Sequence, residues 1–351
     1  MTGTIYIEIN GRKVGSGFPV YTIAELSANH RQQFDEAVKL IEAAKDAGAD
    51  AVKLQTYTPD TITIDVDSDL FLRTEGLWAG RTLYDIYSEA YTPWEWQPKL
   101  KRVADELGID LFSSPFDKTA VDFLEEMGCP AYKVASFEIV DIPLIEYIAS
   151  KGKPIIMSTG MATLAEIDEA VQAARMAGVS QIALLKCSSV YPAPTEEMNL
   201  RTIPHLAEAF ELPVGLSDHT LEIAVPVTAV AVGACIVEKH FTLSRSIPSP
   251  DSAFSLEPDE FKAMVGAIRT TEKALGEVRY GTNAQEDKSR VFRRSLFAVQ
   301  DIKAGELFTE KNVRSIRPDY GIHPRFLKDV MGRRAGQDIE RGTPISWGLI
   351  Y

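Results

Sequence analysis

Eight short apolar runs, separated by longer amphipathic stretches, are the feature that most constrains the fold of this chain. The runs are 21–24, 51–54, 110–113, 131–134, 154–157, 182–185, 213–216 and 234–237. Apolar runs that alternate with helical periodicity are typical of a parallel sheet whose strands are joined by crossover helices. Eight such units predict a closed (β/α)8 TIM barrel. An open, doubly wound sheet is the alternative, because periodicity does not prove closure.

The length of the chain predicts a second, smaller domain. A barrel needs about 250 residues, which leaves a remainder in a chain of 351 residues. The final helical pattern of the barrel ends near Leu275-Gly276, and a polar stretch without clear periodicity follows it. We therefore expect a barrel with its N-terminal hairpin at 1–278, a linker at 279–290 and a small β-rich domain at 291–351.

Short β signals also lie outside the eight runs. Asn10-Gly11 is a strong hairpin turn signal between the β-like segments 5–9 and 12–14. We expect this hairpin to close the floor of the barrel. In the C-terminal domain, 296–299 and 313–316 are the strand-like runs.

Composition and charge exclude several classes of protein. The chain is 45% apolar and 25% charged, which is a globular composition. Its net charge of −13 argues against a general nucleic-acid binder, which needs a basic face. It lacks an apolar stretch long enough to span a membrane and a secretory signal, so we expect a cytoplasmic protein. The three cysteines are widely spaced in apolar surroundings, which predicts core residues and not a disulfide framework.

Two histidines end neighbouring strands. His219 follows the seventh apolar run and His240 follows the eighth. The carboxyl ends of barrel strands converge on one rim, where two neutral imidazoles can hold a divalent metal and leave positions open for substrate. Either histidine alone is better explained as a satisfied polar residue at a strand end. Their matched placement, with lysines near the ends of other strands, favours the metal.

The other strand ends carry lysines, a carboxylate and hydroxyls. These residues are Glu25, Lys53, Gln55, Ser114, Lys133, Ser136, Ser158, Ser188, Ser189 and Ser217. Ammonium groups supply charge and hydroxyls supply directional donors, so the set suits a small ligand with phosphate and carboxylate groups. Any single serine can be a strand-end cap, and the argument depends on the whole ring.

A long insertion, 59–98, follows the second strand. It has no strand run and is rich in aromatic residues, which include Trp78, Tyr84, Tyr87, Tyr91, Trp94 and Trp96. Loops of this length in compact domains are usually functional, and in a barrel the loops after the strands form the rim of the active site. A packed cover over apolar surface is the alternative.

The strand-end motifs resemble those of the sialic acid synthase family, over nearly the whole chain. The motifs are Ala-Glu-Leu-Ser-Ala-Asn-His (24–30), Lys-Leu-Gln-Thr (53–56), Ser-Ser-Pro-Phe (113–116), Tyr-Lys-Val-Ala-Ser (132–136), Ser-Thr-Gly-Met (158–161), Tyr-Pro-Ala-Pro (191–194) and Gly-Leu-Ser-Asp-His-Thr (215–220). Ser-Ile-Arg-Pro (315–318) resembles a motif of that family's C-terminal antifreeze-like (SAF) domain. Within the family, 55–63 and 89–96 resemble the pseudaminic acid synthase branch.

The resemblance implies a reaction. Phosphoenolpyruvate condenses with the open-chain aldehyde of an N-acetylated amino sugar, the enol C–O bond breaks, and phosphate and a nine-carbon 2-keto acid form. The branch implies a 2,4-diacetamido-trideoxy hexose as the sugar and pseudaminic acid as the product. N-acetylneuraminate and legionaminate synthases are the alternatives within the family.

The resemblance also implies roles for residues. His219 and His240 would hold Mn²⁺ or Mg²⁺, and Glu25 would transfer a proton. Glu138 would share that work or serve as a structural carboxylate that pairs with a nearby lysine. The positions that match phosphoenolpyruvate-binding residues are Lys53, Ser114, Lys133, Ser136, Ser158, Ser189 and Ser217, where Ser189 departs from the asparagine of the sialic acid branch. The positions that match sugar-binding residues are Gln55, Tyr191, Asp251 and Arg317. Arg317 matches an arginine that reaches the barrel of a partner subunit, which implies a domain-swapped homodimer.

Two other functional classes are compatible with parts of the sequence. A barrel aldolase would use Lys53 or Lys133 as a Schiff-base nucleophile. A non-catalytic sugar-binding protein is suggested by the tail, since that domain also occurs in ice-binding proteins. The intact set of strand-end lysines, histidines and Glu25 argues against a purely binding role.

Overall fold

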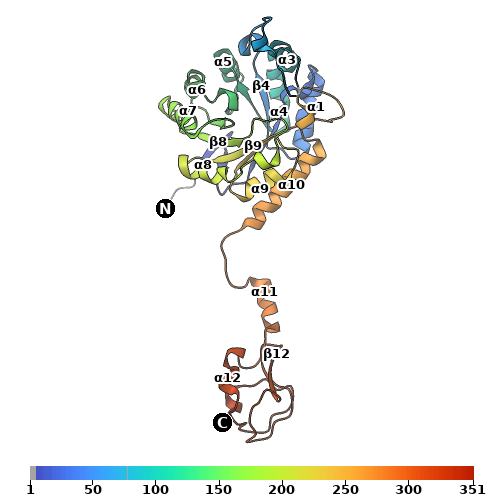
Figure 1. Ribbon diagram of the computed structural model, residues 1–351, viewed down its shortest axis with the longest axis vertical. Coiled ribbons are helices and arrows are strands. Elements are labelled where there is room, and N and C mark those ends of the chain that lie inside the picture. The colour runs from blue at the N-terminus through green and yellow to red at the C-terminus, as the bar shows by residue number, and fades with distance from the viewer. Residues whose placement is uncertain (1–4, 77) are drawn as a thin grey trace. The chain divides into compact units, whose positions relative to one another are not determined.

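The computed structural model describes residues 5–76 and 78–351. The chain divides into two compact units, Met1–Gly276 and Glu277–Tyr351. The first unit is a closed barrel of parallel strands surrounded by helices, and the second is a small unit with a two-stranded sheet (Figure 1). The predicted TIM barrel is confirmed, and the open sheet is excluded.

Each of the eight predicted runs overlaps one strand of the barrel. The strands are β3 (Tyr21–Glu25), β4 (Ala51–Thr56), β5 (Asp110–Pro115), β6 (Tyr132–Val134), β7 (Ile155–Ser158), β8 (Ile182–Cys187), β9 (Val214–Asp218) and β10 (Ile236–His240). They pair in sequence order, and β10 closes the barrel against β3. Because all strands are parallel, their carboxyl ends lie on one rim.

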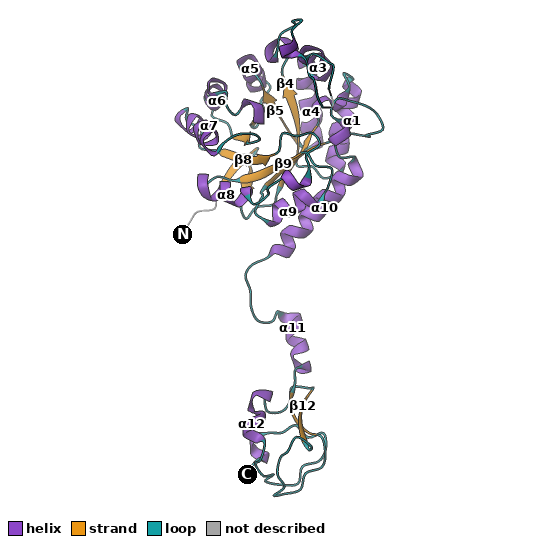
Figure 2. Cartoon of the chain, in the orientation of Figure 1, coloured by secondary structure: helices purple, strands orange, loops and turns teal. Residues whose placement is uncertain are grey.

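A helix follows each barrel strand, and together these helices surround the barrel (Figure 2). They are α1 (Phe34–Asp46), α4 (Gln97–Leu107), α5 (Lys118–Glu126), α6 (Ile142–Ala149), α7 (Leu164–Met176), α8 (Thr202–Phe210), α9 (Ala224–Ala231) and α10 (Pro258–Leu275). The first shows the pattern, since it buries Ala37, Leu40 and Ile41 and leaves its charged face outward. Burial of a leucine or isoleucine side chain contributes roughly 1.5–3 kcal/mol.

The predicted hairpin forms ahead of the barrel. It consists of β1 (Tyr6–Ile9) and β2 (Arg12–Gly15), which pair antiparallel. Ile7, Ile9 and Val14 are buried and belong to the same apolar cluster as the barrel strands. The hairpin therefore contributes directly to the barrel core.

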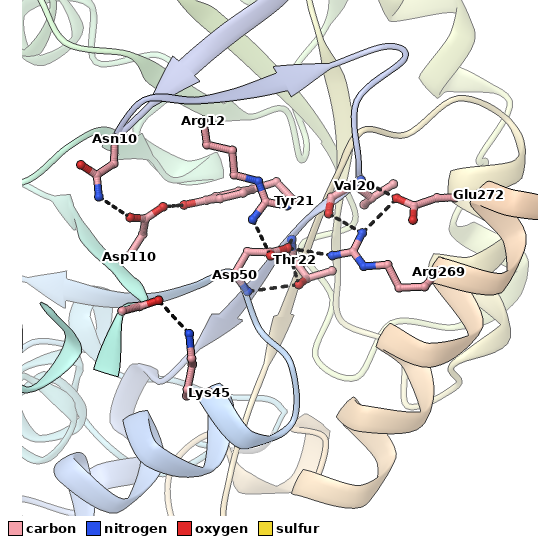
Figure 3. A network of polar contacts seen from close by, with 11 residues as sticks. Asn10, Arg12, Val20, Tyr21, Thr22, Lys45, Asp50, Asp110, Arg269 and Glu272 are labelled. Carbon is pink, nitrogen blue, oxygen red and sulfur yellow. Dashed lines mark hydrogen bonds and ion pairs between the residues drawn. The ribbon is translucent and has the colours of Figure 1, made fainter. Parts of the chain in front are cut away.

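A polar network fixes the hairpin to the amino-terminal ends of the strands (Figure 3). The Asn10 amide donates to Asp110 at the start of β5 (2.9 Å). Asp50, just before β4, pairs with Arg12 of the hairpin (2.5 Å) and with Arg269 of α10 (3.0 Å). The hairpin thus closes the barrel end opposite the rim that carries the predicted site, as expected.

The insertion is built of short helices and turns. It contains α2 (Pro59–Ile62), a 3-10 turn at Asp69–Phe71, α3 (Leu83–Ala90) and a second 3-10 turn at Trp94–Trp96. These elements lie between the carboxyl end of β4 and helix α4, so the insertion belongs to the rim that carries the predicted site.

The second unit has its own small core. Its elements are α11 (Ala284–Ser289), β11 (Ser295–Ala298), β12 (Val313–Ile316) and α12 (Leu327–Val330). Leu296, Phe308, Val330 and Ile345 are among its buried residues. Within the stretch read as a linker, α11 forms because Asn283 caps it and Glu286 completes a capping box.

Two further expectations concern cysteines and membranes. Cys129, Cys187 and Cys235 are buried and unpaired, as predicted. Among the helices of residues 5–76 and 78–351, none is both long and apolar enough to cross a membrane.

Candidate active site

The carboxyl ends of the strands bring most of the predicted site residues together. In the register of the barrel, Glu25 lies opposite His240 on one side and Lys53 on the other, and Gln55 lies opposite Ser114. The predicted residues that are buried here are Glu25, Lys53, Ser114, Lys133, Ser136, Ser158, Ser217, His219 and His240. Charged side chains are rarely buried unless they are paired, so this cluster is unusual for a core.

Two lysines and two carboxylates form its centre. The Lys53 ammonium lies 2.7 Å from Glu25 and 3.5 Å from Glu238. The Lys133 ammonium lies 3.9 Å from Glu238 and donates to the Ser158 hydroxyl at 2.6 Å. The cluster therefore places two ammonium groups beside two carboxyl groups in a buried space.

The two carboxylates differ in pKa. Burial, together with the repulsion of Glu238, raises the pKa of Glu25 to about 7, although Lys53 opposes the shift. Burial also acts on Glu238, but Lys133 and Lys53 outweigh it and hold the pKa of that carboxyl below its usual value. Carboxyl groups whose environments push their pKa values apart can divide acid and base roles. Near pH 7, Glu238 is the anion and Glu25 exchanges a proton.

The serines line the space around the lysines. The Ser114 hydroxyl accepts from Lys53 at 3.4 Å, and the Ser136 hydroxyl accepts from the Gly160 N–H at 3.1 Å. The Ser189 hydroxyl is buried without a hydrogen-bond partner among the described residues. A Cβ at Gly160 would lie 2.3 Å from the Ser189 oxygen and 2.7 Å from that of Ser136. Only glycine lets these hydroxyls converge here.

His219 and His240 face each other, with ring centroids 5.3 Å apart. His219 Nδ1 donates to the carbonyl of Ser188 at 2.7 Å, which fixes the ring and leaves Nε2 available. Nδ1 of His240 is buried without a partner in the described part of the chain. An orphaned ring nitrogen beside a fixed imidazole fits a two-histidine metal site.

Such a site would be sparse in protein ligands. Within residues 5–76 and 78–351, no group of three or more His, Cys, Asp or Glu is arranged to hold a metal ion. Two imidazoles leave several coordination positions for water or substrate, which is typical of a catalytic site and not of a closed structural one.

The predicted sugar-binding residues of the barrel connect to this centre. The Gln55 amide donates to Glu25 and to the Ser27 hydroxyl, both at 3.0 Å. Ser27 in turn donates to Asp251. Tyr191 lies against His219, with ring centroids 4.2 Å apart. A hydrogen-bonded chain therefore joins Asp251 to Glu25 on one side of the site.

Glu138 and Arg317 are the remaining predicted residues. One oxygen of Glu138 is buried without a hydrogen-bond partner among the described residues, and burial raises the pKa of this carboxyl to about 7. None of the ion pairs within 5–76 and 78–351 involves Glu138, so the lysine pairing considered as an alternative is not formed. Arg317 is exposed and directly follows β12 in the second unit.

Two residues of this region were assigned no role from the sequence. Glu238 lies between the two lysines, and its alternation with His240 along β10 was the signal that both point into the barrel. Trp78 of the insertion lies 6.4 Å from Tyr191, measured between ring centroids. No periodicity in the insertion indicated this contact.

Comparisons with known proteins confirm the resemblance found in the sequence. The NeuB family model matches residues 40–280, and the SAF domain model matches residues 293–350. Pseudaminic acid synthase from Campylobacter jejuni subsp. jejuni serotype O:2 is 47% identical over 329 residues, which cover 94% of this chain and 96% of that protein. Pseudaminic acid synthase from Helicobacter pylori is 44% identical and covers 93% of this chain and 97% of its own length.

A solved structure agrees with both the fold and the sequence. The crystal structure of N-acetylneuraminic acid synthetase from Leptospira borgpetersenii, in complex with citrate, is 31% identical with a TM-score of 0.72. The match covers 82% of this chain and 95% of that one. With a family model that spans more than half of its residues, the chain belongs to the NeuB family and carries a SAF domain at its C-terminal end.

Proposed function

We propose that this protein condenses phosphoenolpyruvate with the open-chain aldehyde of a 2,4-diacetamido-trideoxy hexose to give pseudaminic acid and phosphate. The observation that carries the proposal is the buried pair Lys53 and Lys133, facing two histidines at the rim of a barrel. Identities of 44% and 47% to pseudaminic acid synthases over most of the chain support this sugar.

Lys53 and Lys133 bind the anionic groups of phosphoenolpyruvate. Both ammonium groups are buried, so their attraction for a phosphate or carboxylate is weakly screened. The surrounding hydroxyls provide directional hydrogen bonds to the ligand oxygens. These hydroxyls belong to Ser114, Ser136, Ser158, Ser189 and Ser217.

His219 and His240 hold a divalent cation, Mn²⁺ or Mg²⁺. The orphaned Nδ1 of His240 and the fixed ring of His219 support this assignment. When bound, the cation supplies Lewis-acid polarisation of the aldehyde oxygen. Both imidazoles lie beside Tyr191, with ring centroids 4.2 Å (His219) and 6.2 Å (His240) from its own, on the side where the sugar would bind.

Glu25 moves the proton that the reaction requires. C3 of phosphoenolpyruvate forms a bond to the aldehyde carbon, water adds to C2, and the C2–O bond to phosphate breaks. The water loses two protons in the same sequence, one to the aldehyde oxygen and one to the departing phosphate. A carboxyl with a pKa of about 7 can both accept and donate a proton near neutral pH. Glu138, whose pKa is also raised to about 7, is the second candidate for this work.

The protein acts as a domain-swapped homodimer in which Arg317 of one subunit contacts the sugar bound in the other barrel. The match of the second unit to the SAF domain and the exposure of Arg317 support this proposal. A cytoplasmic location accompanies it, because the three cysteines are buried and unpaired.

One observation favours the Schiff-base aldolase as a second candidate. Burial lowers the pKa of Lys133, and a lowered pKa is what a nucleophilic lysine needs. Borohydride reduction in the presence of substrate separates the two mechanisms, because it traps an imine on Lys133 and leaves a synthase unmodified.

A phosphate-release assay tests the proposed reaction. Enzyme with Mn²⁺ and phosphoenolpyruvate is supplied with 2,4-diacetamido-trideoxy hexoses of different stereochemistry or with N-acetylmannosamine. We expect release of phosphate with the sugar that leads to pseudaminic acid. Faster release with N-acetylmannosamine, or with the precursor of legionaminate, would assign the protein to another branch.

A further inference from the structure

Trp78 lies in the insertion, between two segments that are hydrogen-bonded to each other. An antiparallel bridge joins Leu72 to Thr82. Within it the Arg73 N–H donates to the Arg81 carbonyl at 2.9 Å, and the Gly80 N–H donates to the Arg73 carbonyl at 2.8 Å. Trp78 therefore lies near the end of a loop whose base is closed by backbone hydrogen bonds.

The loop is also attached to the rim of the barrel. Arg81 forms an ion pair with Glu89 of α3 at 2.6 Å. Tyr87 of the same helix packs edge-on against Tyr57, with centroids 5.5 Å apart, and Tyr57 is buried directly after β4. These contacts hold the loop in place relative to the strand that carries Lys53.

The Trp78 ring reaches the aromatic side of the active site. Its centroid lies 6.4 Å from that of Tyr191, at an interplanar angle of 59°. Tyr191 contacts His219 at 4.2 Å and Phe254 at 5.1 Å between centroids. Trp78 thus extends the wall formed by Tyr191 and Phe254 beside the predicted metal ligands.

The indole N–H of Trp78 has no acceptor. Nε1 is buried, and residues 5–76 and 78–351 offer it no hydrogen-bond partner. Buried indole N–H groups usually find a partner, because an unpaired donor loses its hydration without compensation. Trp94 of the same insertion follows the rule, since its Nε1 donates to the Tyr57 carbonyl at 3.0 Å. The exception at Trp78 points to an acceptor supplied by a ligand.

The chemistry of the wall identifies the acceptor. An indole N–H is a neutral donor that cannot accept, so it fits a neutral carbonyl oxygen. The anionic groups of phosphoenolpyruvate are better served by Lys53 and Lys133. An acetamido group offers a carbonyl oxygen for the N–H and a methyl group that packs on aromatic faces such as Tyr191.

We propose that Trp78 is a specificity-determining residue whose indole N–H donates to the carbonyl oxygen of one acetamido group of the sugar. This inference rests on the proposed function, because it assumes that the sugar lies beside Tyr191 and the two histidines. Trp78 selects the acylated sugar over one with a hydroxyl at the same carbon, since the shorter group leaves the buried N–H unpaired.

The test compares wild type and Trp78→Phe, each with the full sugar and with two sugar analogues. Each analogue carries a hydroxyl in place of one acetamido group of the 2,4-diacetamido-trideoxy hexose. For wild type, we expect replacement of the contacted group to lower kcat/KM for the sugar by on the order of tenfold or more. Trp78→Phe should lower kcat/KM by a similar factor with the full sugar. With the analogue that lacks the contacted acetamido group, Trp78→Phe should cause no further loss. The KM for phosphoenolpyruvate should not change.

Trp94→Phe is the matched control, since it removes an indole N–H that is already paired inside the insertion. It should lower stability without changing the preference among the three sugars. Equal losses with all three sugars in Trp78→Phe would reduce Trp78 to a packing residue and overturn the proposal. An unchanged kcat/KM with the full sugar would overturn it as well.

The proposed function is tested separately, by turnover of the full sugar in wild type. Titration of the same sugars into wild type and Trp78→Phe measures the contact even without turnover. A loss of affinity confined to one acetamido group supports the assignment to Trp78, and equal affinities of the two proteins for every sugar contradict it.

Discussion

Replacement of Lys53 by methionine probes the buried charge cluster most sharply. Lys53 lies 2.7 Å from Glu25 and 3.5 Å from Glu238, and all three side chains are buried. Glu238 keeps Lys133 as a neighbour at 3.9 Å, but Glu25 loses its only ion-pair partner among the described residues. Removal of one member of a buried ion pair typically costs about 3–5 kcal/mol in the free energy of unfolding. We expect Lys53→Met to lose that amount at pH 8.

The loss should depend on pH in a defined direction. The pKa of Glu25 is about 7 in the folded protein, above its ordinary value of 4.5, and removal of the Lys53 ammonium raises it further. A carboxyl group whose pKa is higher in the folded than in the unfolded protein stabilises the fold, and this contribution is complete at pH values below 4.5. The contribution is lost as the pH rises through the folded-state pKa. The stability deficit of Lys53→Met should therefore be small near pH 5 and largest at pH 8.

Urea unfolding at pH 5 and pH 8 measures this deficit. The double variant Lys53→Met/Glu25→Gln should recover part of the loss at pH 8, because it no longer buries an unpaired carboxylate. Lys151→Met is the control, since its pair with the exposed carboxylate of Asp122 is screened by solvent and contributes little to stability. A deficit of the same size at both pH values would refute the assigned pairing. In Lys53→Met, the free energy of phosphoenolpyruvate binding should weaken by about 1.5–3 kcal/mol, which corresponds to a loss of affinity of roughly 10- to 150-fold.

The other predictions concern the metal site, the proton transfer, a buried ion pair and the dimer. His240→Ala, or chelation of the metal, should abolish activity with an unchanged circular dichroism spectrum, and full activity of metal-free enzyme would contradict the metal site. Glu25→Gln should remove the limb near pH 7 from the pH profile of kcat, and an unaltered profile would exclude Glu25 from proton transfer. Lys239→Met should lower the free energy of unfolding by about 3–5 kcal/mol, because Lys239 forms a buried ion pair with Asp218 at 2.5 Å. Urea unfolding measures this loss, and a loss below about 1 kcal/mol would show that the pair contributes little. Mixed dimers of Arg317→Ala and His240→Ala should regain activity, and verified heterodimers that stay inactive would reject the swapped arrangement.

The fold was predictable because its determinants are local and repeated. Each strand run carries its own apolar signal, and the Asn10-Gly11 turn sets the register of the hairpin. Closure of the barrel follows from pairing of β10 with β3, which are separated by about 200 residues in sequence. Periodicity holds no information on such a contact, and the number of units was the only guide.

Site residues at the ends of strands were predictable from the sequence. Site residues identified only by the alternation of side chains along a strand were less so. Glu238 and His240 share the inner face of β10, but only the histidine was assigned a role. Lys239 points to the other face, where it meets Asp218 of β9. This ion pair depends on the register between β9 and β10, which the sequence of one strand does not reveal.

Trp78 shows the limit of prediction in loops. The aromatic content of 59–98 indicated either a rim of the site or a cover. The position of one indole depends on the Leu72–Thr82 bridge and on the ion pair of Arg81, neither of which has a sequence signature. Contacts of this kind are set by tertiary packing and appear only in the structure.

The fate of the enol oxygen of phosphoenolpyruvate tests the central claim most directly. Enzyme with Mn²⁺ and the 2,4-diacetamido-trideoxy hexose is supplied with phosphoenolpyruvate labelled with oxygen-18 in the bridging position. Mass spectrometry then follows the phosphate and the sugar product. A synthase that breaks the C–O bond releases labelled phosphate in equal amount with a nine-carbon 2-keto acid. Unlabelled phosphate, or phosphate without the keto acid, would contradict the account.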